Sequence, residues 1–404
     1  MEQTQLLPLT RYYHNKLRQV NLDFKRSLYN KINWEARIIG IEGPRGVGKT
    51  TMLLQRILEK YHDPDATFYI SLDHLAFAQV DPLDVIAHFY SRGITEFYID
   101  EVHKYKKWKW SEALKQLYDE YADIRIVYTG SSMLDIEASR EDLARRQTVY
   151  RLYGMSFREF LEYEKILKIE PVTLEGLLSD HIRIAMEISA RTKILKHFDT
   201  YLEYGYYPFF RDAGGDFLLR LAATANDVLE KDLPSVSEIT YSTIEKAKKL
   251  LMIIASHLPF QPNMKDLVPA LDTTRDTCVM LLYKMDQAGL LNLLTAELKS
   301  YKRLVKPEKI YLGDTNLMFA LGVNPEEGTL RETFFANQLS AVSTVQMPKK
   351  GDFIVAQKYL FEVGGPYKDF DQIAGVPDSF LAIADLEVGD SQTRIPLWMF
   401  GLLY

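Results

Sequence analysis

Short apolar runs and amphipathic segments alternate along the first 155 residues. Five runs are rich in β-branched and aromatic residues and are expected to be strands: 37–41, 67–71, 96–100, 124–129 and 148–152. Helical spacing between them is clearest at 50–58 and 111–121. Strands that alternate with helices predict an α/β fold in which a parallel sheet is covered by helices.

The pattern changes after Gly154. Residues 156–231 read mainly as helices, with interruptions at 205–208 and 214–215. Residues 234–314 follow as a long helix, two further helices and two strand-like runs, and the chain from 317 onward mixes helix and strand. Several domains are therefore expected in 404 residues.

Composition narrows the class of protein. Hydrophobic residues make up 47% and charged residues 26%, and the formal net charge is −6, so charge alone does not favour nucleic acid as a partner. The single cysteine, Cys278, excludes an internal disulfide framework and a cysteine-based zinc site. No apolar run is long enough to cross a membrane and no basic-then-apolar signal begins the chain, so we expect a cytoplasmic protein.

A glycine-rich segment follows the first expected strand and opens a helix. It matches the P-loop pattern GxxxxGK[ST], whose backbone N–H groups bind phosphates. Lys49 is predicted to reach the β- and γ-phosphates, and the Thr50 hydroxyl to bind Mg²⁺. The sequence therefore predicts an ATP or GTP site formed by Gly43, Pro44, Arg45, Gly46, Val47, Gly48, Lys49, Thr50 and Thr51.

Two acidic residues end the third expected strand about fifty residues later. Asp100 is predicted to hold Mg²⁺, and Glu101 to orient or deprotonate the attacking water, as in a Walker B segment. Asp-Glu after a strand is also a common way to start a helix, and only the P-loop upstream favours the catalytic interpretation.

Four further residues are candidates for catalysis. Thr129 and Ser131 follow the fourth expected strand, where a hydroxyl can contact the water or the γ-phosphate; an ordinary turn is an equal alternative. Arg145 or Arg146 could reach the γ-phosphate of a neighbouring subunit, or could simply end a solvated helix.

The chain resembles prokaryotic AAA+-type P-loop ATPases that carry a C-terminal winged helix and a restriction-endonuclease-like domain. The segments that carry the resemblance occur in the family's order at 43–51, 100–103, 129–132, 152–160, 204–208 and 309–314. The resemblance implies an ATPase core (1–155), a helical lid (156–232), a winged helix (233–315) and a nuclease-like end (316–404).

The expected winged helix contains helices at 263–271 and 272–288, with Asp272 or Thr273 as the cap of the second. Cys278, Leu281, Leu282 and Met285 share one face of that helix and should be buried. The runs 290–294 and 309–312 could pair as a wing, joined by a basic loop at 299–306 that could contact DNA phosphates. The outward positions Arg275, Val279, Met280, Tyr283 and Lys284 are largely apolar, which favours a protein or interdomain contact over base reading.

The expected nuclease-like domain offers Glu332, Asp352 and Glu362 as carboxylates. The resemblance implies a lysine two residues after the last of them, where this chain has Gly364. Lys368 could substitute only if its loop folds back, and Gln372 matches a polar helix position of that fold. We therefore expect a domain without nuclease activity.

Together these features predict an Mg²⁺-dependent ATP-hydrolysing switch, and an arginine that acts on a neighbouring subunit would make it a homo-oligomer. One alternative is a nucleotide-gated factor that binds DNA or protein with negligible turnover. Another is a metal-dependent nuclease that ATP controls.

Overall fold

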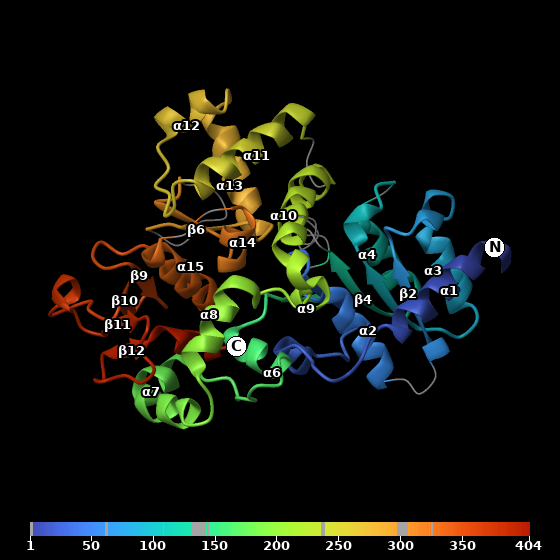
Figure 1. Cartoon of the computed structure of the whole chain (residues 1–404). Helices are drawn as coiled ribbons and strands as arrows, with labels where there is room; N and C mark the ends of the chain where they lie inside the picture. The colour runs from blue at the N-terminus through green and yellow to red at the C-terminus, as the bar shows by residue number, and fades with distance from the viewer. Residues whose placement is uncertain are drawn as a thin grey trace. The chain divides into compact units, whose positions relative to one another are not determined.

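The computed structural model describes residues 3–60, 64–107, 109–130, 143, 145–235, 239–296, 306–322, 324 and 326–404. The chain divides into two compact units (Figure 1). Unit 1 comprises residues 1–153 and Glu230–Ile239, and unit 2 comprises Gly154–Leu229 and Thr240–Tyr404. In the described residues, no helix is both long and apolar enough to cross a membrane.

Unit 1 is built on a five-stranded parallel sheet with the order β2-β3-β4-β1-β5. Its strands are β1 (Ile38–Glu42), β2 (Thr67–Ser71), β3 (Glu96–Asp100), β4 (Arg125–Gly130) and β5 (Gln147–Arg151). β1, β2 and β3 are buried along their whole length, which is why they read as continuous apolar runs. The prediction of a parallel α/β sheet is confirmed, with strand ends within one residue of those expected.

In the part of unit 1 that the structure describes, the sheet is accompanied by the α-helices α1 (Gln3–Arg18), α2 (Lys49–Lys60), α3 (Pro82–Tyr90) and α4 (Trp110–Glu120) (Figure 1). Helix α1 packs against β2, and α2 packs against β4. Parallel strands place their carboxyl ends at one edge of a sheet. The segments that follow β1, β3 and β4 therefore meet at the same edge.

Unit 2 begins with helices, which are α6 (Phe157–Tyr163), α7 (Leu174–Ser189), α8 (Ile194–Tyr204), α9 (Phe210–Ala213) and α10 (Phe217–Asp227). Ser156 caps α6 through a reciprocal capping box with Glu159. The Ser156 hydroxyl also donates to the Tyr404 carbonyl at 2.6 Å, as does Arg158 Nε at 3.0 Å. The first turn of α6 is therefore joined to the C-terminal residue.

The middle of unit 2 contains α11 (Tyr241–Ala255), α12 (Met264–Ala270) and α13 (Arg275–Gln287), followed by β6 (Leu291–Leu294) and β7 (Lys309–Leu312). β6 and β7 pair antiparallel as expected. The predicted caps of α13 were wrong: Thr274, not Asp272 or Thr273, accepts the hydrogen bond from the Thr277 amide. Asp272 has a positive φ of 45° and lies outside the helix.

The expected buried face of α13 is confirmed, because Cys278, Leu281, Leu282 and Met285 are fully buried. Burial also raises the pKa of the Cys278 thiol. The outward placement of Val279 was wrong, since it is buried too. Most of the basic loop expected at 299–306 lies outside the described residues.

The last part of unit 2 holds α14 (Thr315–Ala320), α15 (Glu327–Ser340) and a mixed sheet of order β12-β11-β10-β9-β8. Its strands are β8 (Val345–Gln346), β9 (Phe353–Val355), β10 (Tyr359–Gly364), β11 (Ser379–Ile383) and β12 (Arg394–Pro396). Asn316 of α14 donates to the Leu202 carbonyl of α8 at 2.9 Å. Apart from Glu230–Ile239, which belong to unit 1, the regions expected as lid, winged helix and nuclease-like end lie in one compact unit. The four-domain boundaries stay a prediction.

Candidate functional site

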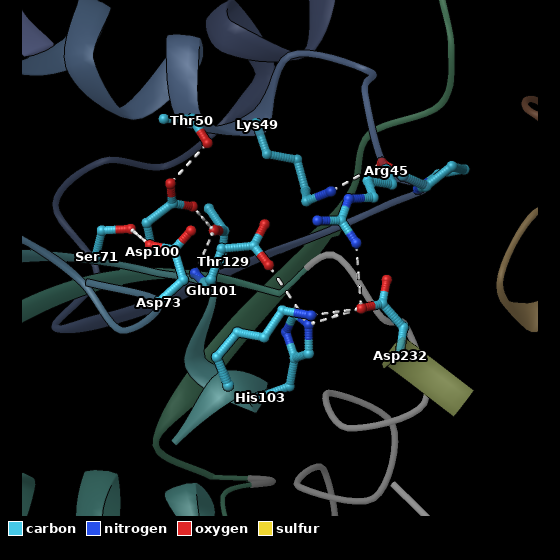
Figure 2. Close-up of polar contacts among 12 residues, drawn as sticks. Arg45, Lys49, Thr50, Ser71, Asp73, Asp100, Glu101, His103, Thr129 and Asp232 are labelled. Carbon is cyan, nitrogen blue, oxygen red and sulfur yellow. Dashed lines mark hydrogen bonds and ion pairs between the residues drawn. The ribbon is translucent and has the colours of Figure 1, made fainter. Parts of the chain in front are cut away.

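The glycine-rich loop connects β1 to α2 in unit 1. Gly46 and Gly48 have φ values of 87° and 99°, a left-handed backbone that favours glycine. Lys49 begins α2, and its side-chain nitrogen donates to the carbonyl oxygens of Gly43 at 2.9 Å and Pro44 at 2.8 Å (Figure 2). The loop residues lie where the sequence predicted, with Thr50 and Thr51 in the first turn of α2.

Lys49 is only 5% exposed. Burial lowers the pKa of Lys49, while the nearby carboxylates of Glu101, Asp100 and Asp232 oppose that shift. A buried cation surrounded by carboxylates is suited to meet the negative charge of a polyphosphate.

Asp100 ends β3 and is 2% exposed. Its Oδ2 accepts a hydrogen bond from the Thr50 hydroxyl at 2.6 Å, and Thr129 donates to Oδ1 (Figure 2). Oδ2 also accepts a hydrogen bond from the Tyr69 hydroxyl at 2.9 Å. Burial, followed by the charge of Glu101, raises the pKa of Asp100. A buried carboxylate beside a threonine hydroxyl is the oxygen-donor set that Mg²⁺ prefers.

Glu101 has a left-handed backbone, with φ 59° and ψ 44°. A residue other than glycine pays about 1–2 kcal/mol in this conformation, and such strain is commonly found at functional sites. The Glu101 amide donates to the Thr129 hydroxyl at 3.4 Å. Its Oε2 lies 3.4 Å from Nε2 of His103, a side chain with no exposed surface.

The remaining predicted site residues are Thr129, Ser131, Arg145 and Arg146. Thr129 is fully buried and contacts Asp100 and Glu101, so it supports the acidic pair. Ser131 lies outside the described residues. Arg145 is exposed, whereas Arg146 forms two hydrogen bonds with the Asp119 carboxylate of α4 at 3.2 and 3.3 Å.

Sequence reasoning missed several residues that contact this site. Arg26 is buried and donates to the carbonyl oxygens of Val47 at 2.7 Å and Tyr153 at 2.8 Å. It therefore fixes the glycine-rich loop from a segment upstream of β1. Tyr69, His103 and Asp232 were missed as well, because each is distant in sequence from its partner or belongs to no recognised spacing.

A second group of carboxylates lies in unit 2. Glu332 of α15 accepts hydrogen bonds from Lys309 at 2.7 Å and Tyr311 at 2.5 Å. Asp352 Oδ2 accepts from the Val363 amide at 2.9 Å, and burial, with the charge of Glu332, raises the pKa of Asp352 to about 6. Among the described residues, no group of three or more His, Cys, Asp or Glu side chains is arranged to hold a metal ion.

Position 364 is a glycine, and the lysine that this group contains is Lys368, the substitute that the sequence allowed. The chain after Gly364 folds back, and Lys368 Nζ lies 2.6 Å from Glu362 Oε1. A Cβ at position 364 would lie 2.6 Å from the Lys368 side chain, so the glycine makes room for the lysine. The Gln372 amide faces the same carboxylate and, with its nitrogen turned inward, donates to it.

Known proteins are similar to the part of the chain that holds Lys49, Asp100 and Glu101. Residues 35–161 match the family model described as the AAA domain. They span β1 to β5 with the glycine-rich loop and the Asp100–Glu101 pair. This stretch is therefore similar to AAA domains. An uncharacterized protein of Methanocaldococcus jannaschii, MJ1637, is 28% identical over 422 residues, which cover 95% of this chain and 87% of that protein.

Solved structures similar to the chain include the RuvB Holliday junction branch migration motor of Thermotoga maritima. It is 16% identical, with 72% of this chain and 89% of that chain covered and a TM-score of 0.27. The S. cerevisiae Hsp104–ADP complex is 14% identical, with 68% and 40% covered and a TM-score of 0.30.

Proposed function

We propose that the protein is an Mg²⁺-dependent ATPase of the AAA+ class that acts as a nucleotide-driven switch. The observation that carries the proposal is the meeting of Lys49, Thr50, Asp100 and Glu101 at one edge of the parallel sheet (Figure 2). These residues come from the start of α2, from the last residue of β3 and from the residue that follows it. They combine a cation for phosphate, oxygen donors for a metal and a carboxylate for water.

Each residue has a distinct part in the proposed reaction. Lys49 would exchange its two carbonyl acceptors for phosphate oxygens, together with the loop N–H groups. Thr50 and Asp100 would hold Mg²⁺, which supplies positive charge to the phosphates when bound. Glu101 would orient the attacking water and accept its proton.

The central test compares ATP hydrolysis by the wild type and Glu101→Gln, each with and without DNA. Because the substitution removes only the group that activates water, the rate should fall by about 10²–10⁴-fold while nucleotide binding is kept. Glu120→Gln is the matched control, because Glu120 is an exposed carboxylate on α4. A Glu101→Gln rate within twofold of wild type would exclude the proposed role.

Lys49→Ala tests the binding step separately. Loss of the ammonium that meets the phosphates should abolish ATP binding in calorimetry. Wild-type affinity in this variant would contradict the assignment of the glycine-rich loop.

For the region from α11 to β7, we propose a winged helix that contacts protein rather than DNA bases. On α13, Arg275 is exposed, and Met280, Tyr283 and Lys284 are half-buried. Few polar groups therefore remain on this face to read base edges. DNA binding by a switch with negligible turnover stays the alternative, and stimulation of the ATPase by DNA would favour it.

For residues 316–404, we propose a nuclease-like domain that does not cut DNA. The return of Lys368 to Glu362 removes one objection to a nuclease. Yet Glu362, Glu332 and Asp352 each already accept hydrogen bonds from neighbouring groups. These contacts favour a structural role for the three carboxylates over an ATP-controlled nuclease site that binds a metal.

A further inference from the structure

Asp232 belongs to unit 1 although it lies far beyond the AAA match at 35–161. The chain passes through unit 2 from Gly154 to Leu229, returns to unit 1 for Glu230–Ile239, and re-enters unit 2 at Thr240. Asp232 stands in this returning segment and is 1% exposed.

One oxygen of Asp232 meets three nitrogen-bearing side chains. Oδ1 lies 2.7 Å from Lys104 Nζ, 3.4 Å from His103 Nε2 and 3.5 Å from Arg45 Nη1 (Figure 2). Arg45 is part of the glycine-rich loop, and His103 and Lys104 follow Glu101. Asp232 therefore contacts both the glycine-rich loop and the segment that follows Glu101.

Asp232 is held in its ionised form. Burial by itself raises the pKa of Asp232, but the hydrogen bonds from His103 and Lys104 outweigh it and hold the pKa well below its ordinary value. Ion pairs that are removed from water have a well-defined geometry and lose much when one partner is removed.

The contact with His103 leads to the catalytic glutamate. The same Nε2 atom lies 3.4 Å from Asp232 Oδ1 and 3.4 Å from Glu101 Oε2. A single N–H group cannot make a full hydrogen bond to two carboxylates at once. The strength of the Asp232 contact therefore affects how firmly His103 holds Glu101.

We propose that Asp232 is a positioning residue of the ATP site that sets the orientation of Glu101 through His103. The proposal rests on the proposed ATPase function. It implies that residues 35–161 do not by themselves complete the catalytic arrangement. Asp232 in the returning segment then contributes to the rate of ATP turnover.

The charge of Asp232 distinguishes this role from a purely structural one. The negative charge of Asp232 acts on the Lys49 ammonium, so its loss leaves the loop more positive. A triphosphate should then bind as tightly as before or more tightly. A positioning role predicts slower turnover without weaker binding, whereas structural damage would impair both.

The test measures kcat, nucleotide Kd and melting temperature for Asp232→Asn, with ATP and Mg²⁺. We expect kcat to fall on the order of tenfold, as is typical when a residue that orients a ligating or catalytic group is lost, and Kd not to rise. Glu230→Gln is the matched control, because it removes an exposed carboxylate from the same segment. Its kcat should equal that of the wild type.

A second variant, His103→Gln, tests the route through histidine. It should slow turnover to a similar extent, and the double variant should be no slower than the slower single variant, because both act on Glu101 along one path. Multiplied losses would overturn the proposal, and so would an Asp232→Asn rate within twofold of wild type or a parallel loss of nucleotide affinity. A wild type without ATPase activity would instead overturn the proposed function on which this inference rests.

Discussion

Replacing Lys368 with methionine should lower the free energy of local unfolding of strand β10 in unit 2. Glu362 is 2% exposed on this strand, and Lys368 Nζ is 2.6 Å from its Oε1. Methionine keeps the length and apolar stem of lysine and removes the charge. The buried carboxylate would then lose its cationic partner.

The size of the effect follows from the burial of both partners. Removing one partner of a fully buried ion pair costs about 3–5 kcal/mol. The Lys368 side chain is 26% exposed, and Gln372 remains beside the carboxylate. We therefore expect a smaller loss than for a fully buried pair, about 2–3 kcal/mol.

Hydrogen exchange of the amides at 359–364 measures the free energy of opening at this strand. A loss of that size corresponds to about 30- to 150-fold faster exchange, since each 1.4 kcal/mol is tenfold. Lys358→Met is the matched control, because Lys358 is an exposed lysine directly before β10. Its exchange should stay near that of the wild type.

The double variant Glu362→Gln/Lys368→Met removes both charges and should recover most of the lost stability, because no unpaired charge remains. An increase in the exchange rate of less than about threefold in Lys368→Met alone would refute the reasoning. It would mean that the ion pair contributes little to the stability of β10.

Three further predictions concern oligomerisation, cleavage and pH. If Arg145 or Arg146 acts in trans, ATPase activity per chain should rise with protein concentration, and the alanine variant should lose rate but keep its nucleotide affinity. Arg145 is the first to test, because Arg146 already pairs with Asp119. An ATPase rate per chain that does not change as the chains assemble counts against both residues. Purified protein should not cut supercoiled, linear or single-stranded DNA with Mg²⁺ or Mn²⁺, and cleavage that an Asp352→Ala variant abolishes would overturn this. Burial raises the pKa of Asp314 to about 7, above its unfolded value, so its contribution to stability is present at low pH and is lost as pH rises from about 4 through 7. Asp314→Asn should remove that dependence in chemical unfolding, and a difference between wild type and variant that is constant over this range would contradict the shift.

The sequence by itself determined the parts of the ATP site that are contiguous. The loop from Gly43 to Thr50 needs only a strand, a positive φ at two glycines and the start of a helix, and all of these follow from local residue preferences. The pair Asp100–Glu101 could be predicted as well, because a parallel sheet gathers the carboxyl ends of its strands at one edge. Local signals were weaker where several residues compete, as with the cap of α13, which is Thr274.

Only the tertiary structure decided which distant side chains complete these sites. Lys104 and Asp232 are separated by 128 positions in sequence, yet their charged atoms lie 2.7 Å apart. Lys368 reaches Glu362 because the chain folds back through Gly364, which leaves room for the lysine stem. Spacing along a chain constrains contacts within a helix or turn, because the backbone there has a fixed repeat. Contacts through space depend instead on how separate segments pack, and a single sequence carries no fixed repeat that reveals them.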